Sequence, residues 1–159
     1  MPNLNWDNLN ALQIGKYAEY YAKMEFASYG FEVYTCEVDD HGVDFIVKHQ
    51  KHPFYEVQVK SLRENKTGNY MFIQKSKMDI EDAHRIVCFI HFKNEQMPHV
   101  YLIPATVWQK PNGLFVERDY DKPYQKSKPE WGLQFSQKNR SLLEPYKIEH
   151  SIHKLKAEK

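Results

Sequence analysis

Hydrophobic and polar positions change their period along the first part of the chain. Between residues 12 and 29 the apolar side chains recur every three to four positions, which predicts a helix. Gly30 follows, where helices commonly end in a left-handed residue. Residues 31–36, 43–48 and 54–61 instead alternate with a period of two and predict three strands. The short turn between the last two strands predicts an antiparallel hairpin.

The middle of the chain continues as a mixture of strands and helices. The predicted elements are, in order, a strand at 70–73, a helix at 76–84 with Ser76 as its N-cap, a strand at 85–92, a strand at 100–103 and a short helix at 105–110. Residues 85–92 are strongly apolar, which is typical of a buried central strand. Cys88 lies inside this run, where a buried thiol behaves as a small apolar residue. The order of elements predicts an α/β fold with a mixed central sheet.

The last part of the sequence is rich in proline, lysine and tyrosine. The features predicted there are short strands at 114–117 and 132–135, packing of Leu142 and Leu143 on the body, and a frayed polar tail from residue 150. No internal repeat or linker interrupts the chain. We therefore expect a single domain over residues 1–159, with a core at about 12–110 and a C-terminal extension at about 111–159.

Charge is balanced overall but uneven along the chain. The 22 basic and 21 acidic side chains nearly cancel, so composition indicates no global attraction to nucleic acid. Residues 1–44 hold eight acids against two lysines, a net charge of −6, whereas residues 45–66 carry a net charge of +3. Acids beside a basic stretch suit a metal site next to a phosphate track. An ordinary mixed surface explains the charges equally well.

The cysteines and the apolar runs bear on the compartment. Cys36 and Cys88 are far apart and show no metal-ligand spacing, which indicates a reduced protein without a disulfide framework. The polar N-terminus lacks the apolar centre of a signal peptide. No apolar run approaches the ~20 residues that span a bilayer. A cytoplasmic protein without membrane association is therefore expected.

The predicted hairpin carries an unusual set of polar side chains. Because side chains alternate along a strand, Glu56, Gln58 and Lys60 point to one face. Asp44 on the preceding strand joins them if the polar faces of the two strands meet. The apolar set, expected to pack against a helix, comprises Phe45, Val47, Tyr55, Val57 and Val59. An edge hairpin that shows its polar face to water is the simpler alternative.

Four short motifs occur in order: GKYAE at 15–19, GFEV at 30–33, GVDFIV at 42–47 and VQVKS at 57–61. Their order, spacing and strand context resemble the PD-(D/E)XK superfamily, and are most similar to its Mrr-like and Holliday-junction-resolvase-like branches. The resemblance covers roughly residues 12–92. It implies a restriction-endonuclease-like mixed β-sheet core flanked by helices, and divalent-metal-dependent endonuclease activity on DNA.

The resemblance also implies roles for individual residues. Asp44 matches the first acid of the family motif and would be the principal ligand of Mg²⁺ or Mn²⁺, with the carbonyl of Val59 as a further ligand. Lys60 matches the terminal lysine, which orients the attacking water or offsets charge on the phosphate. Glu19 matches an acid on the first helix that supports the metal or its waters. Such a site hydrolyses a phosphodiester by metal-assisted attack of water.

Two positions depart from the family pattern. Val43 stands where the motif has proline, which matters little because valine also favours a strand. Gln58 replaces the second acid, and a neutral amide does not offset the charge of a metal ion, although the Mrr-like branch is known for glutamine there. Glu56 lies about 6.6–6.8 Å back along the same face and is the candidate for the missing carboxylate and metal ligand. The alternative is a catalytically inactive module of this fold that binds nucleic acid or a protein partner.

Two further stretches offer contacts for DNA. Gln74, Lys75 and Lys77 stand at the start of a predicted helix, whose amides favour phosphate, although two lysines at a helix start are more often simply solvated. In the extension, aromatic residues interleave with lysines, a pattern that suits stacking on unpaired bases. These residues are Tyr120, Tyr124 and Trp131 with Lys122, Lys126 and Lys128. An aromatic cover packed on the body is the preferred interpretation of that stretch.

A homodimer would serve both strands of a duplex, because one site cuts one strand.

Overall fold

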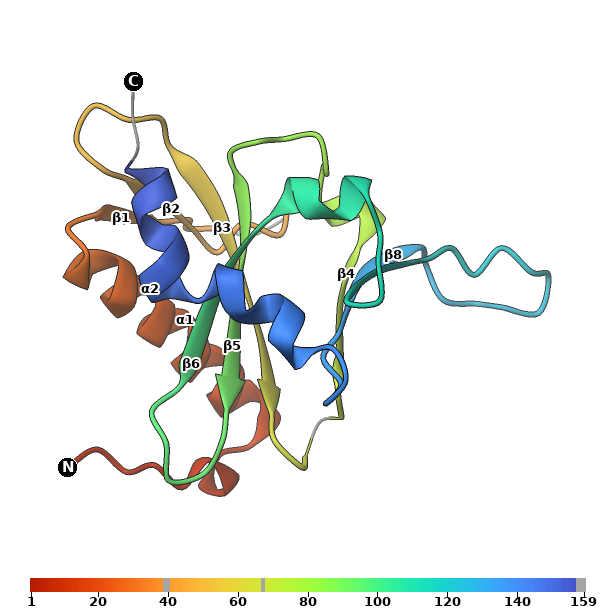
Figure 1. Ribbon diagram of the computed structural model, residues 1–159, viewed down its shortest axis with the longest axis horizontal. Coiled ribbons are helices and arrows are strands. Elements are labelled where there is room, and N and C mark those ends of the chain that lie inside the picture. The colour runs from red at the N-terminus through yellow and green to blue at the C-terminus, as the bar shows by residue number, and fades with distance from the viewer. Residues whose placement is uncertain (39–40, 67, 157–159) are drawn as a thin grey trace.

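A mixed five-stranded sheet forms the centre of the computed structural model, which describes residues 1–38, 41–66 and 68–156 (Figure 1). Its strands are β1 (Glu32–Thr35), β2 (Phe45–Lys48), β3 (Tyr55–Arg63), β5 (Arg85–Phe92) and β6 (His99–Pro104), in the order β1-β2-β3-β5-β6. β3 and β5 run parallel, and the other neighbouring pairs are antiparallel. The predicted hairpin of β2 and β3 and the predicted buried strand β5 are both confirmed.

A second sheet of three strands joins the C-terminal extension to the core. Its strands are β4 (Tyr70–Gln74), β8 (Glu130–Gln134) and β7 (Phe115–Arg118), in the order β4-β8-β7. Both pairs are antiparallel. Because β4 precedes β5 in the chain and β7 and β8 follow β6, backbone hydrogen bonds tie the extension to the segment that leaves β3.

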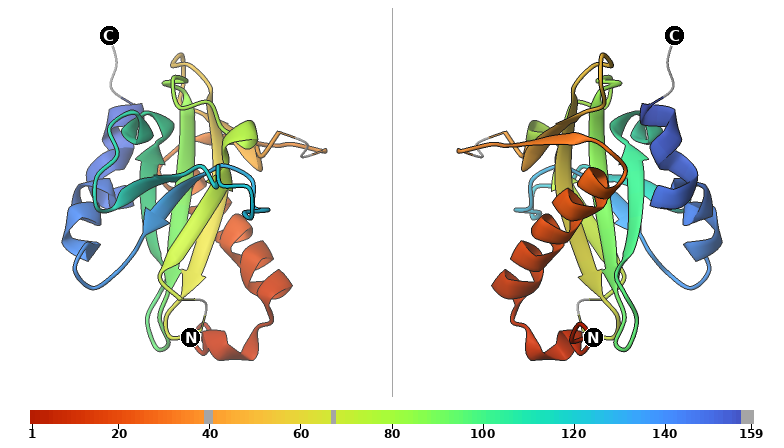
Figure 2. Two further views of the ribbon diagram at one scale, coloured as in Figure 1. Left: turned by 90° about the vertical axis from the view of Figure 1, so that its right-hand side faces the viewer. Right: turned by 90° about the vertical axis from the view of Figure 1, so that its left-hand side faces the viewer.

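The helix α1 (Ala11–Ser28) packs across the five-stranded sheet (Figure 2). It begins at Asn10 with a capping box, in which the side chains of Asn10 and Gln13 each accept the backbone N–H of the other. Its buried face comprises Ile14, Ala18, Tyr21, Ala22 and Phe26. These side chains share one cluster with Phe45, Val47 and Val57. The predicted packing of the hairpin's apolar face on a helix is therefore confirmed.

Strand β5 is buried on both faces and separates two apolar clusters. Ile86 and Cys88 face the cluster around α1, whereas Val87 and Phe89 face a second cluster with Trp108 from η3 (Ala105–Gln109) and side chains of the second sheet. Burying one large apolar side chain stabilises the fold by about 1.5–3 kcal/mol. Burial also raises the pKa of the Cys88 thiol, which stays protonated and packs as an apolar group.

The other helical segments are single turns or little more. They are η1 (Trp6–Asn8), η2 (Lys75–Lys77), η4 (Arg140–Tyr146), α2 (Ile148–Ser151) and η5 (Ile152–Leu155). Within the described ranges, every helix is too short or too polar to cross a membrane. Leu143 is buried as predicted, but Leu142 is 50% exposed, so the prediction that it docks on the body is wrong.

The helix predicted at residues 76–84 is wrong. Only the turn η2 forms, and Met78 after it is extended. The side chains of Asp79 and Asp82 accept the backbone N–H groups of Glu81 and His84 at 2.9 and 2.8 Å. Aspartate that bonds to nearby backbone in this way stabilises turns at the expense of helix. Ser76 consequently caps no helix, and the phosphate-binding helix start expected there does not exist.

The frayed tail predicted from residue 150 is also wrong for the residues that the structure describes. α2 and η5 continue to Leu155, and residues 157–159 lie outside the described part. Ile148 and Ile152 are both 4% exposed and belong to the cluster around α1. The segment looks polar in sequence because the side chains that face the core are spaced among polar residues; Leu155 also packs against this cluster.

Two glycines provide a matched test of packing. Gly132 in β8 lies under the ring of Tyr70, which donates a 2.5 Å hydrogen bond to Glu130, so an added Cβ would overlap the ring. Gly15 in α1 has nothing within 4 Å of an added Cβ. We expect Gly132→Ala to lower the free energy of unfolding by about 1–3 kcal/mol. Gly15→Ala should raise it by up to about 1 kcal/mol, since alanine favours helix.

Urea denaturation of the two variants and the wild type measures both changes. The same chemical change is thus expected to have opposite signs at the two positions. Equal effects would contradict the packing of Tyr70 over Gly132.

A second test concerns His91, which is buried at the end of β5 beside Glu64. Burial lowers the pKa of His91 to about 4, so at neutral pH its uncharged ring lies 3.2 Å from the Glu64 carboxylate as a hydrogen-bonding group. In the unfolded chain a histidine titrates near ~6.5. Between pH ~4 and pH ~6.5 the unfolded state therefore binds more protons than the folded state. The contribution of His91 to the free energy of unfolding is full above pH ~6.5 and is lost as the pH falls towards ~4.

We expect wild type to lose about 2–3 kcal/mol of unfolding free energy through His91 as the pH falls from 7 to 4. His91→Gln should flatten this loss, whereas His84→Gln, a change at an exposed histidine, should leave it intact. Urea denaturation at a series of pH values measures the three slopes. A His91→Gln slope equal to that of wild type would contradict the assignment.

Candidate active site

The candidate site lies where β2 separates from β3. The Asp44 N–H donates to the carbonyl of Val57 at 2.9 Å, and the Asp44 carboxylate accepts the Val59 N–H at 2.7 Å. β2 begins at the next residue, whereas β3 continues to Arg63. Asp44 is therefore fixed at two points on the exposed edge that β3 presents beyond the end of β2.

The carbonyl of Val59 offers a second candidate oxygen ligand at the same edge of β3. Within a strand, the N–H and C=O of one residue point to the same side, so the Val59 carbonyl faces the edge on which its N–H meets Asp44. Carboxylate and carbonyl oxygens suit Mg²⁺, which in proteins is usually held by one or two carboxylates and keeps several waters. In the described ranges, no three His, Cys, Asp or Glu side chains are grouped to hold a metal. The donor set thus fits a sparsely ligated hard ion and does not fit a zinc site.

The polar face predicted for the hairpin is present. Ile46 pairs with Glu56, so these two side chains share a face with Gln58 and Lys60. Asp44 directly precedes β2 and reaches the Val59 N–H with its carboxylate. A cavity of about 270 Å³ opens on this face. Its lining residues are Gly42, Gln58, Lys60, Phe72, Ile73, Gln74 and Lys77. The fold thereby brings two of the predicted catalytic residues, Gln58 and Lys60, together with two of the predicted DNA contacts.

Glu56 and Gln58 are both engaged by one buried cation. Arg85 Nη1 lies 3.1 Å from the Glu56 carboxylate, and Nη2 lies 3.4 Å from the Gln58 side-chain oxygen. The charge of Glu56 is therefore compensated within the protein. This pairing makes Glu56 a weaker candidate for a metal ligand than its place on the strand suggests.

Arg85 is the functional residue that sequence reasoning missed. It is 5% exposed, and its Nη2 also donates to the carbonyls of Gly42 at 2.8 Å and Lys77 at 2.9 Å. The parallel register of β3 and β5 places Arg85 directly beside Glu56. The available signal was a charged residue at the start of an otherwise apolar strand. Its partners could not be named without the register.

Gly42 is required at the centre of this network. Its φ is +75°, a conformation that favours glycine. An added Cβ would lie 3.1 Å from the Gln58 side-chain nitrogen, 3.2 Å from Arg85 Nη2 and 3.3 Å from the Lys77 carbonyl. The loop before Asp44 can therefore approach the guanidinium only if this position lacks a side chain.

Glu19 faces the same corner from α1 but is already hydrogen-bonded. Its carboxylate lies 3.2 Å from Lys16 and 3.3 Å from Lys23, and Lys23 lies over the ring of Phe45. The pKa of Lys16 is raised, chiefly by its hydrogen bond to Glu19 and slightly by the charge of Asp44. The charge of Glu19 is thus compensated by two lysines, and its support of a metal ion or of the metal's waters stays a prediction.

Lys75 does not line the cavity. Its ammonium lies 2.7 Å from Glu117 and 2.6 Å from Asp119, and 4.2 Å from the ring centre of Trp131. Gln74 and Lys77 on either side of it do line the cavity. Of the three predicted DNA contacts, two therefore lie where substrate could reach them and one is anchored in the second sheet.

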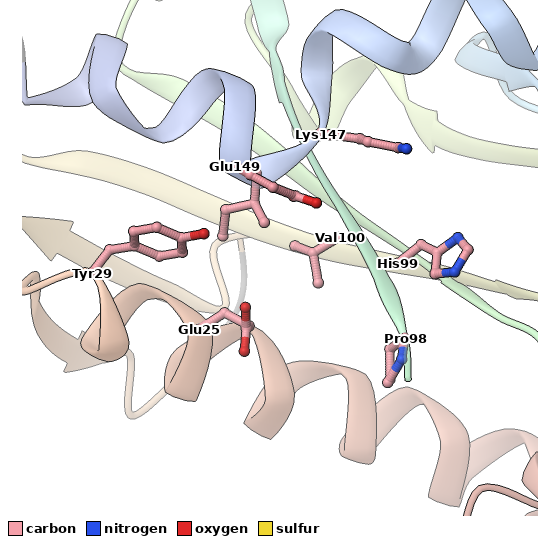
Figure 3. A pocket seen from close by; sticks show the side chains of 8 residues that line it. Glu25, Tyr29, Pro98, His99, Val100, Lys147 and Glu149 are labelled. Carbon is pink, nitrogen blue, oxygen red and sulfur yellow. The ribbon is translucent and has the colours of Figure 1, made fainter. Parts of the chain in front are cut away.

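A second cavity, of about 370 Å³, lies between α1, the start of β6 and α2 (Figure 3). Glu25, Glu149 and Tyr29 direct polar groups into it. The pKa of Glu25 is raised, chiefly by burial and further by the charge of Glu149. None of the residues predicted from sequence to act in catalysis lines this cavity.

Known proteins resemble this chain in structure and not in sequence. No protein-family model and no curated protein matches it. The bacterial homing endonuclease I-Ssp6803I has a TM-score of 0.53 and 16% identity, over 91% of this chain and 89% of its own. Hjc, a Holliday junction resolvase of the archaeon Archaeoglobus fulgidus, has a TM-score of 0.48 and 10% identity, over 87% and 93% of the chains. The likeness to the homing endonuclease confirms the predicted restriction-endonuclease-like fold.

The network around Arg85 predicts a large loss of stability when the guanidinium is removed. Arg85→Met should lower the free energy of unfolding by about 3 kcal/mol, because carbonyls from two loops lose their donor inside the protein. Arg85→Lys should restore only part of this, since one ammonium lacks the planar fork that reaches Glu56 and the carbonyls together.

Arg118→Met is the matched control at an exposed arginine, with an expected loss of less than about 1 kcal/mol from its contact with the Tyr70 ring. Chemical denaturation measures all three variants. Hydrogen exchange of the amides at residues 41–44 should accelerate in Arg85→Met alone. Unchanged exchange there would contradict the role of Arg85 in holding the Asp44 corner.

Proposed function

We propose that this protein is a divalent-metal-dependent endonuclease that hydrolyses phosphodiester bonds of DNA. The observation that carries the proposal is the position of Asp44, whose carboxylate accepts the Val59 N–H where β2 leaves β3, at the residue next to Lys60 in the chain. The fold likeness to a homing endonuclease supports the same class of activity. Asp44 and the Val59 carbonyl are the residues that would hold the metal ion.

When bound, Mg²⁺ or Mn²⁺ would supply a Lewis acid and lower the pKa of its water. Lys60 lines the adjacent cavity, where its ammonium offsets the negative charge that develops on the phosphate. Asp44 keeps its orientation through the Val59 N–H, so its carboxylate needs no rearrangement when substrate binds. Glu19 is paired with Lys16 and Lys23 on α1, so we assign it no part in holding the metal ion.

Gln58 is assigned a role different from that of the acid it replaces. Arg85 has only donors, so it fixes the Gln58 side-chain oxygen towards itself. The Gln58 amide nitrogen is then the group left for the cavity, where it can donate to a phosphate oxygen. Gln58 therefore binds substrate in this proposal and does not ligate the metal. Gln74 and Lys77 form the opposite wall and contact the DNA backbone.

One observation favours a second candidate function, a module of this fold that binds nucleic acid or a protein partner without cutting. Arg85 engages both Glu56 and Gln58, so the charge of Glu56 is compensated within the protein and the Gln58 side-chain oxygen is directed towards the guanidinium. A site with so little negative charge binds Mg²⁺ weakly. Catalysis and binding are separated by the experiment that follows.

The test is cleavage of supercoiled, linear and branched DNA with Mg²⁺ or Mn²⁺. Asp44→Asn and Lys60→Met should each reduce the rate at least about 100-fold, because each removes charge that acts on the transition state. Asp44→Asn keeps an oxygen that can accept the Val59 N–H, so its loss of activity would not reflect a lost hydrogen bond. Glu95→Gln and Lys51→Met change exposed charges elsewhere and should cut at the wild-type rate.

Metal-dependent cutting that both site variants abolish would support the nuclease. DNA binding without cutting in any metal, unchanged by both substitutions, would instead support the binding module. Cutting that survives Asp44→Asn would refute the proposed site.

A further inference from the structure

The chain between β7 and β8 projects away from the body (Figure 1). We call residues 119–129 the arm. Apart from Tyr120 and Gln125, its residues are exposed. The aromatic cover packed on the body, preferred from sequence for this stretch, is wrong for the arm, because Tyr124 is 73% exposed. It holds for Trp131, which is 9% exposed in β8.

The root of the arm is fixed at a defined place beside the cavity of the candidate site. Lys75 donates its backbone N–H to the carbonyl of Pro129 at 2.9 Å, and its ammonium binds Glu117 and Asp119. Both ends of the arm therefore meet at one residue of η2. The neighbours of that residue, Gln74 and Lys77, line the cavity with Lys60.

The tip of the arm is a closed turn. The Gln125 N–H donates to the Lys122 carbonyl at 2.9 Å, and the Gln125 side chain accepts the Lys122 N–H at 3.1 Å. Pro123 occupies the second position of the turn, which its fixed φ favours. Tyr124 follows it, so a constrained turn presents the tyrosine ring to solvent.

The charge of the arm is concentrated around that ring. Lys122, Lys126 and Lys128 are all exposed, and no acid lies between the first and the last of them. The arm has two acids: Asp119 is paired with Lys75 at the root, and exposed Asp121 directly precedes the first of the three lysines. An exposed aromatic ring among cations is the combination that binds single-stranded nucleic acid, because the ring stacks on a base and the cations track the backbone.

We infer that the arm binds a single-stranded segment of the nucleic acid that enters the candidate site. Tyr124 stacks on an unpaired base, and the three lysines contact phosphates. Phe72, which is 45% exposed and lines the cavity, is a second aromatic surface between Lys60 and the root of the arm. A paired base offers no free face to Tyr124, so the preferred substrate is DNA with a forked or single-stranded part. The placement beside a cutting site rests on the proposed function, whereas binding by the arm does not.

The experiment measures binding by fluorescence anisotropy in EDTA, which prevents metal-dependent cutting. The probes are a single strand, its blunt duplex and a forked duplex of the same sequence. Tyr124→Ser should weaken binding of the single strand and the fork about tenfold and leave the duplex unchanged. Tyr124→Phe should bind like wild type because the ring remains. Tyr34→Ser removes an exposed tyrosine from β1 and is the matched control, with no expected effect.

Replacing Lys122, Lys126 and Lys128 together by glutamine tests the phosphate contacts. The slope of log K against log salt for the single strand should become shallower by about 2, since each phosphate contact contributes about 0.7. Thermal unfolding of each variant verifies that the fold is intact. Because the arm is exposed, unfolding temperatures should match that of wild type.

The outcomes separate this inference from the proposed nuclease. Arm-dependent binding without cutting in any metal would support the arm and count against the nuclease. Cutting that requires Asp44, with binding of the single strand unchanged in Tyr124→Ser and in the triple lysine variant, would overturn the arm alone. Absence of binding to all three probes, or an equal loss in Tyr34→Ser, would also overturn it.

Discussion

The buried guanidinium of Arg85 is the interaction on which the geometry of the candidate site depends. Arg85 is 5% exposed, and a charged side chain can be buried to this extent only if surrounding groups compensate its charge. The compensation comes from Glu56 on β3, from the Gly42 carbonyl in the loop before Asp44 and from the Lys77 carbonyl at the end of η2. Because one planar group holds all three segments, the loop that delivers Asp44 and the turn that forms the cavity wall keep fixed positions relative to β3.

This arrangement also gives a physical reason for an amide at position 58. A carboxylate there would form a second ion pair with Arg85, beside the one that Glu56 already makes. Glutamine satisfies the guanidinium with its oxygen and keeps a donor for the cavity. The substitution that looks like decay of a metal site in the sequence is thus consistent with a site in which Asp44 supplies the metal-binding charge and the strand supplies hydrogen-bond donors.

Local periodicity decides how much could be predicted from the sequence. α1, β2 and β3 were predictable because each buries a face whose spacing is visible within a few residues, and β5 because it is a nearly continuous apolar run. The helix at 76–84 failed because two aspartates bond to nearby backbone, and the tail failed because Ile152 packs on elements distant in sequence. The shared face of Gln58 and Lys60 followed from a period of two. Arg85 could not be placed, because the parallel register of β3 and β5 has no local signature.

Lys75 illustrates why residue type and position do not settle a role. It stands two residues from Lys77 and is equally basic, yet its ammonium is bound by Glu117 and Asp119 at the root of the arm. Left unpaired, those two carboxylates would repel any phosphate that approached the lysines beyond them. By cancelling one of these two charges, Lys75 reduces that repulsion without contacting nucleic acid. A lysine that the sequence assigns to a phosphate can therefore favour binding from inside the protein, through the charges that it cancels.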